Sequence, residues 1–452
     1  MNREIFRRHT QSLNALAIPL IANAVFGLAI ELIDQAMLGH VSIAAFQSVG
    51  AIGNFLYTIS GILGSLAITF NIYGSRAMGE NRPENYYDYL ISSLVMNGIL
   101  GIGFGLLLLV TEIPLLRGLY GFSGSTLRAG VDYLSIMSGY VLLQLVSFTL
   151  TNCLKIRKKT RWIFIVSTTT TIIHTCLNYL LIFGAFGFPL LSVRGAALSD
   201  IVTLCLDIII YSVVLRDDLK ASFRHRPTVI SSIFSRSLPL MGQETLEGSI
   251  FVIGLNAILS HIGGLALSGY LLISQLFQIT FIPTYMYGTA LITVVSESFG
   301  SRNRNGMSDI PKVAAVWVMA LFSVLGILSF LLREPLIGLI TNQIHLIRYA
   351  ADIFIILLLA NLFRPLFEVY KSSLQSVGKS VYVLSRSFII ELISLAVMLI
   401  LSFALRMGLN GVAACLFFNY AVLYFLLRMF YKKSVEIRAV KEGHSEPFLN
   451  IK

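Results

Sequence analysis

The sequence predicts an all-α membrane protein with twelve transmembrane helices in two pseudo-symmetric six-helix lobes. Three observations support this prediction: apolar runs recur along the whole chain, basic residues gather on alternate loops, and short motifs repeat at a nearly constant spacing. The mean hydropathy is +0.79 and 13% of the 452 residues are charged. A soluble domain usually carries about 25% charged residues, so the composition favours a membrane protein.

Each apolar run is long enough to cross a bilayer as a helix, which takes about 20 residues. The first run is too long for a signal peptide, and we interpret it as the first span. We expect spans near 13–38, 47–72, 90–112, 131–153, 162–184, 195–215, 237–260, 265–296, 313–332, 346–370, 381–404 and 410–430.

The net charge of +11 reflects topology rather than a nucleic-acid partner. With a cytoplasmic N-terminus, 26 of the 34 lysines and arginines fall on the inside, including Lys371 after the tenth span. Such a bias is typical of cytoplasmic loops, so we expect both termini in the cytoplasm. The six on the outside are Arg117, Arg128, Arg194, Arg333, Arg348 and Arg406.

Matching motifs indicate that the two halves are a tandem duplication. Pro19-Leu20 recurs as Pro239-Leu240, and Gly195-Ala196-Ala197 recurs as Gly411-Val412-Ala413. Six spans per half give both halves the same orientation, with a substrate site expected between them. The predicted parts are an N-lobe at 1–215, a cytoplasmic linker at 216–236, a C-lobe at 237–431 and a cytoplasmic tail at 432–452.

Acidic residues interrupt the apolar runs at corresponding places in the two halves. Asp34 lies in the first span and Glu247 in the seventh. An ionisable group inside a membrane is costly, and it usually serves ion coupling or substrate binding. These acids therefore predict a transporter. The sequence contains no P-loop, HExxH or GxSxG motif, so we expect neither ATP drive, enzymatic activity nor a cofactor.

Further polar residues accompany these two acids. Glu31 lies one turn before Asp34, Glu244 lies one turn before Glu247, and Asp200 falls in the sixth span. Phe281 and Tyr285 in the eighth span either line an apolar cavity for cationic compounds or pack between helices.

Three segments resemble the multidrug and toxic compound extrusion (MATE) family. Residues 31–39, ELIDQAMLG, resemble its first-helix signature. Residues 177–184, LNYLLIFG, followed by Gly195-Ala196-Ala197, are similar to its bacterial NorM-type branch. Pro239, with Glu247 eight residues later, matches the pattern of its seventh helix.

This resemblance implies a V-shaped pair of lobes that exports organic compounds in exchange for Na⁺ or H⁺ across the bacterial cytoplasmic membrane. Asp34 and Asn178 would then form the N-lobe cation site, with Glu31 and Asp200 as further members, and Glu247 would be the C-lobe acid. Carboxylate and amide oxygens suit Na⁺, whereas Asp34 alone suits H⁺. The expected partners are small organic substrates and the lipid bilayer, with no nucleic acid, and the expected functional unit is a monomer.

The tenth and fifth spans depart from the family pattern. Arg364 stands near the place of an expected acid, with Glu368 one turn later, and His174 stands where asparagine is common. Arg364 pairs either with Glu368 on its own helix or with Glu247 across the lobe. His174 is either structural or a pH sensor.

Two other functions compete with cation-coupled export. A flippase for a lipid-linked saccharide, or an exporter of one specific metabolite, would favour a basic cavity. Only Arg364 is expected as a basic residue well inside a span, so this alternative is second. A membrane enzyme is the weakest alternative.

Overall fold

The computed structural model describes residues 3–39 and 41–443, except for the side chains of residues 29, 31–36, 38, 39 and 437–443. The predicted site residues Glu31 and Asp34 therefore have side chains outside the described part. Within the described ranges the secondary structure is helical and contains no strand.

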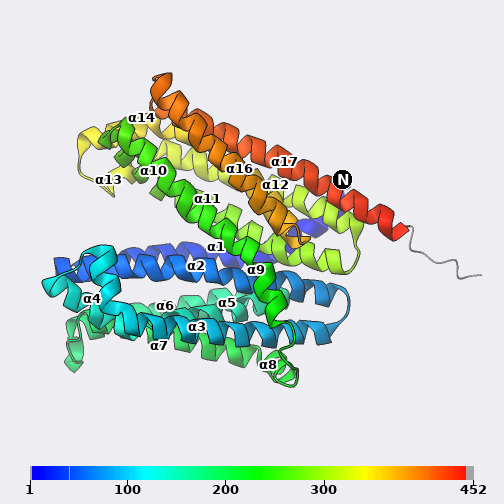
Figure 1. The fold of residues 1–452 in the computed structure, drawn as a ribbon, viewed down its shortest axis with the longest axis horizontal. Coiled ribbons are helices and arrows are strands. Elements are labelled where there is room, and N and C mark those ends of the chain that lie inside the picture. Colours follow the sequence, from blue (N-terminus) through cyan, green and yellow to red (C-terminus); the bar gives the residue numbers. More distant parts are fainter. Residues whose placement is uncertain (1–2, 40, 444–452) are drawn as a thin grey trace, which may run out of the picture. The chain divides into compact units, whose positions relative to one another are not determined.

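The helices of the first half of the chain are mostly long (Figure 1). They are α1 (Arg3–Gly39), α2 (Ile43–Gly79), α3 (Pro83–Tyr120), α4 (Gly124–Met137), α5 (Tyr140–Ile156), α6 (Thr160–Phe183), the 3₁₀ turn η1 (Ala185–Gly187), α7 (Val193–Val214) and α8 (Arg216–Ser222). The second half begins with α9 (Ile230–Thr245), the π turn η2 (Leu246–Ile250), α10 (Phe251–Ile262), α11 (Gly264–Gly300), α12 (Arg304–Leu331) and α13 (Arg333–Gly338). It ends with α14 (Ile344–Ala360), α15 (Arg364–Ser376), α16 (Ser380–Leu399), the π turn η3 (Ile400–Ala404) and α17 (Leu409–Gly443).

The protein is a multi-pass integral membrane protein, as the sequence predicts. Among the described residues, eleven helical stretches are long and apolar enough to span a bilayer, and α4 with α5 makes a twelfth if that bent pair is one span. The bend between α4 and α5 is 42°. The tenth predicted span ends at Ser376 rather than residue 370, and this difference places Lys371 inside the span.

The chain forms two compact units. The first unit comprises residues 18–77 and 82–241, and the second comprises residues 3–17, 78–81 and 242–443. Two hydrogen bonds hold residues 3–17 within the second unit. Trp317 Nε1 donates to Thr10 Oγ1 at 3.1 Å, and Tyr287 Oη donates to Asn14 Oδ1 at 2.5 Å.

The repeated glycines explain how neighbouring helices approach one another in each unit. A Cβ on Gly195 in α7 would lie 2.6 Å from the Leu181 carbonyl oxygen of α6. A Cβ on Gly411 in α17 would lie 3.0 Å from the Leu401 carbonyl carbon of η3. Small residues allow helices to pack closely in a membrane, so the same motif serves the same contact twice.

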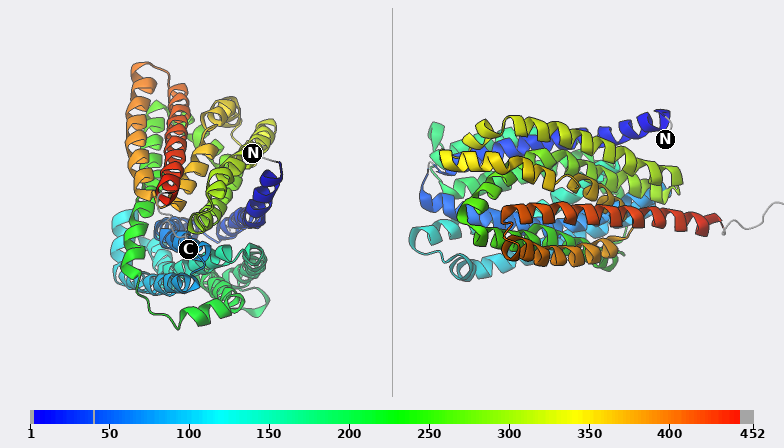
Figure 2. Two further views of the ribbon diagram at one scale, coloured as in Figure 1. Left: turned by 90° about the vertical axis from the view of Figure 1, so that its right-hand side faces the viewer. Right: turned by 90° about the horizontal axis from the view of Figure 1, so that it is seen from above.

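The second unit is built around a large apolar core that joins α10, α11, α14 and α17. Helix α16 packs along α17 at the side of this core. Both views in Figure 2 show α16 in orange beside α17 in red. This arrangement brings the inner face of α16 close to the polar residues described next.

Candidate functional site

A local change in helix geometry places Glu247 in the second unit. Pro239 lies inside α9, and the π turn η2 (Leu246–Ile250) begins seven residues after it. A π turn carries one extra residue per turn, so it redirects side chains relative to a regular helix. Glu247 is the second residue of this turn.

A break between α14 and α15 positions the other charged residues. The chain turns at Asn361, whose side-chain amide donates to the Leu357 carbonyl at 2.9 Å. Helix α15 then begins at Arg364, with Pro365 in its first turn. Proline suits the first turn of a helix because it needs no backbone donor there. Arg364, Glu368 and Lys371 follow at spacings of four and three, so they share one face of α15.

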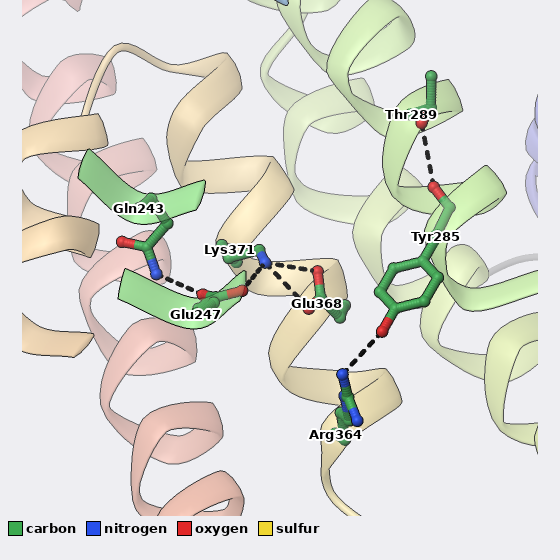
Figure 3. A network of polar contacts seen from close by, with 7 residues as sticks. All are labelled: Gln243, Glu247, Tyr285, Thr289, Arg364, Glu368 and Lys371. Atoms are coloured by element: carbon green, nitrogen blue, oxygen red, sulfur yellow. Dashed lines mark hydrogen bonds and ion pairs between the residues drawn. The ribbon is translucent and has the colours of Figure 1, made fainter. Parts of the chain in front are cut away.

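Lys371 is the centre of a buried ion-pair network (Figure 3). Its ammonium nitrogen lies 2.6 Å from Glu247 Oε2 and 2.9 Å from Glu368 Oε2. Gln243, one turn before Glu247, donates a short hydrogen bond to the same carboxylate. The side chains of Lys371 and Glu368 are 11% and 7% exposed. One fixed ammonium group therefore neutralises part of the charge of two carboxylates where water is scarce.

Arg364 lies on the same helix but bonds to an aromatic group. Its guanidinium donates to Tyr285 Oη at 2.8 Å (Figure 3). It also stacks 4.6 Å above the ring of Phe281. Phe281 itself is buried and stacks on Phe322 with ring centroids 5.5 Å apart. The structure therefore favours the packing role for Phe281, whereas Tyr285 is 37% exposed and reaches the charged residues.

Glu244 differs from the neighbouring acids. It is exposed, and it makes no hydrogen bond or ion pair within the described part of the chain. Because Lys371 already partners Glu247 and Glu368, Glu244 is the carboxylate of this group that is available to a ligand.

A second polar cluster lies in the first unit, on α6 and α7. His174 Nε2 lies 3.0 Å from Asp200 Oδ1 and 3.3 Å from Asn178 Nδ2. Tyr133 Oη donates to Asp200 Oδ2 at 3.2 Å. The structure thus brings together the predicted residues Asn178 and Asp200, and it adds His174 as a third member. Imidazole can supply a positive charge beside Asp200 when it is protonated.

Comparison with known proteins decides the family. The MatE family model matches residues 19–180 and again residues 239–403, which is most of the chain, and the two matches begin at the repeated prolines. This chain belongs to the MATE family. Its members are transporters, and the relatives named NorM place it with the NorM-type MATE proteins.

Two curated relatives cover most of this MATE protein. A protein described as a probable multidrug resistance protein NorM from Thermotoga maritima is 26% identical over 74% of this chain and 72% of its own length. A protein with the same description from Bacillus licheniformis is 27% identical over 79% of this chain and 78% of its own length.

Solved MATE structures share the fold. An outward-facing multidrug resistance MATE family transporter of the MOP superfamily superimposes with a TM-score of 0.85 at 16% identity, covering 95% of this chain and 96% of that chain. A MOP superfamily transporter from Pyrococcus furiosus, described as having reverse polarity of its binding pocket, gives 0.83 at 15% identity, covering 95% and 96%.

The geometry corrects two predictions for this MATE protein. Neither expected partner of Arg364 is found, because Arg364 bonds to Tyr285 while Glu247 and Glu368 both pair with Lys371. Lys371 is a buried residue of the network and not a loop charge. The spacing of three from Glu368 could have revealed it, because residues three apart share a helix face.

Proposed function

We propose that this MATE protein exports organic, cationic or amphipathic compounds across the cytoplasmic membrane by alternating access, driven by a gradient of H⁺ or Na⁺. In this proposal the lobes at 1–215 and 237–431 open the substrate site to each side in turn. The observation that carries the proposal is the partly neutralised acidic network around Lys371 in a member of a transporter family.

The charge balance of this network favours a cationic substrate. Glu244, Glu247 and Glu368 are three acids, and among the described residues the base that forms ion pairs with this group is Lys371. Because Glu244 is exposed and lacks a partner in the described structure, it is the group to which we assign the positive charge of the substrate. Tyr285 and its neighbouring rings would contact the apolar part of the compound.

The first unit would hold the coupling cation. We assign Asp34, Glu31, Asn178 and Asp200 to this site, together with His174, which contacts Asn178 and Asp200. The contact between His174 and Asp200 supports a site that responds to protonation. Asp34→Asn should insert normally yet lose gradient-driven export, because the amide cannot carry the charge that the cation neutralises. Normal export by Asp34→Asn at equal membrane abundance would show that the coupling site does not include Asp34.

Transport by purified protein in lipid vesicles tests the proposal. The cationic dye ethidium and neutral chloramphenicol serve as probes, and H⁺ and Na⁺ gradients are imposed separately. We expect transport that stops when the gradients are collapsed. Glu244→Gln should weaken transport of ethidium more than transport of chloramphenicol, with the exposed Glu334→Gln as the control. Transport that survives collapse of both gradients and follows ATP would refute the proposal.

A second candidate function is export of an anionic metabolite or a lipid-linked saccharide. Arg364 favours it, because this guanidinium is only partly buried and bonds to an exposed tyrosine hydroxyl. Export of a phosphate-bearing compound that is lost in Arg364→Gln, without export of ethidium, would decide for it.

A further inference from the structure

A stripe of polar residues follows the inner face of α16, away from the contacts of Lys371. Ser387, Glu391 and Ser394 occur at spacings of four and three, and they are 0%, 4% and 6% exposed. A helix in a membrane gains little by burying a carboxyl group among other helices, and such a residue is usually functional. The proposed function gives Glu391 no role.

The carboxyl group of Glu391 is not satisfied by hydrogen bonds. Its Oε2 atom is buried without a partner in the described structure. The same holds for Ser387 Oγ on α16 and for Asn419 Nδ2 on the facing helix α17. Asn419 Oδ1 is already used, since it accepts from Ser394 Oγ at 2.8 Å. A buried ionised carboxylate without a partner costs several kcal/mol, so the neutral, protonated acid fits this environment.

The two bases that face Glu391 in the described structure already have other partners. The charged groups that face it are Glu247 from η2 and Glu368, Lys371 and Arg364 from α15, together with the phenol of Tyr420 from α17. Lys371 is held by the two glutamates, and Arg364 is held by Tyr285. Helix α10, which also packs against α16, carries Asn256 and, at its end, the exposed His261.

The unsatisfied atoms on α16 and on its neighbours α10 and α17 include both a donor and oxygens. Asn419 Nδ2 is a donor without a partner in the described structure, and Ser387 Oγ and Asn256 Oδ1 are oxygens without one. A donor facing a carboxyl group can stabilise that group after it loses its proton. The stripe is thus suited to a carboxyl that gains and loses H⁺.

We propose that Glu391 is the proton-exchanging site of the second unit, with Asn419 and the α16 serines as its polar surroundings. This inference rests on the proposed function and specifies its coupling ion. Loss of the proton adds one negative charge beside the Lys371 network and favours binding of a cationic substrate. Uptake of a proton removes that charge and favours substrate release, which gives antiport through differential binding.

Proton binding can be measured without transport. Purified protein in nanodiscs is titrated while released protons are counted, and the infrared C=O band of protonated carboxyl groups is followed. We expect Glu391→Gln to release about one proton fewer per molecule and to lose part of this band, and Glu391→Asp to retain both. Glu334→Gln, which removes an exposed acid, should leave the band unchanged. An unchanged band and proton count in Glu391→Gln would overturn the inference.

Transport gives the second readout. Glu391→Gln should lose ethidium transport driven by a pH gradient, yet it should retain exchange of ethidium for ethidium, which moves no net proton. Glu391→Asp should keep part of the transport driven by the pH gradient. This result would show that transport requires the carboxyl group and that the loss in Glu391→Gln is not a loss of folding. Wild-type driven transport by Glu391→Gln would contradict the inference. If the wild type moves no ethidium in either assay, the proposed export of cations is wrong. The proton titration still tests whether Glu391 exchanges a proton, because it does not depend on transport.

Discussion

At the scale of single residues, Lys371 determines how the second unit tolerates its acids. Its ammonium group contacts Glu247 and Glu368, which come from different helices, so it joins η2 to α15. A buried ion pair adds little stability compared with apolar residues of the same size, but removing one partner is costly. The position therefore predicts unequal effects of single and combined substitutions.

Lys371→Gln should destabilise the protein by about 3–5 kcal/mol, because it leaves two carboxylates in a dry environment without their counter-charge. The combined variant Glu247→Gln, Glu368→Gln and Lys371→Gln should recover much of this loss. Thermal unfolding of the purified proteins in detergent measures both effects. Equal melting temperatures for the wild type and Lys371→Gln would show that the network is not what holds these helices together.

Some of the predicted candidate residues lie together in the structure, and Lys371 is missed for an identifiable reason. Glu247 and Asp200 are found from their charge inside apolar runs, and Asn178 from its motif. Lys371 is missed because the predicted tenth span ends one residue before it, whereas α15 continues to Ser376. A residue at a predicted span end is assigned to a loop by charge alone, although its partners lie in the membrane.

At the scale of helices, close contacts at glycines fix the geometry of the first polar cluster. Helix α6 carries His174 and Asn178, and α7 carries Asp200. Gly195 lets α7 begin against the backbone of α6. The separation of these two helices controls the 3.0 Å contact between His174 and Asp200. The repeated motif predicts that a contact exists, but its distance depends on tertiary packing.

Gly195→Ala should destabilise the protein by about 1–3 kcal/mol, because the added Cβ would overlap the Leu181 carbonyl and push the helices apart. Gly103→Ala on α3 is the matched control. A Cβ there has no neighbour within 4 Å, so the higher helix propensity of alanine should raise stability by about 0.5–1 kcal/mol. Thermal unfolding distinguishes the two. A Gly195→Ala protein as stable as the control would contradict close packing at this point.

Irregular turns within helices are the features that the sequence predicts least. Apolar periodicity identifies the seventh and tenth spans, yet it does not reveal the π turn at Glu247 or the break before Arg364. A proline lies near each of them, since Pro239 precedes the π turn by seven residues and Pro365 stands in the first turn of α15. These two irregularities place the charged residues of the second unit.

At the scale of the whole molecule, the distribution of basic residues predicts the orientation in the membrane. Lys158 and Arg224 should face the cytoplasm, and Arg117 and Arg333 should face outside, because cytoplasmic loops retain most lysines and arginines. Single cysteines at these positions, in a background without the four native cysteines, can be labelled in intact cells with an impermeant thiol reagent. Labelling at 158 or 224 without cell lysis would show that these residues face outside and would contradict the predicted orientation.

Because Lys371 contacts both Glu247 and Glu368, we expect it to act as a built-in cation, so that these two acids need no Na⁺. The most direct test is ethidium transport into vesicles under a pH gradient, with and without Na⁺, by the wild type and Lys371→Gln. We predict that wild-type transport is independent of Na⁺, whereas Lys371→Gln is nearly inactive without Na⁺ and recovers when Na⁺ can occupy the vacated place. A Lys371→Gln variant that transports equally well with and without Na⁺ would contradict the claim.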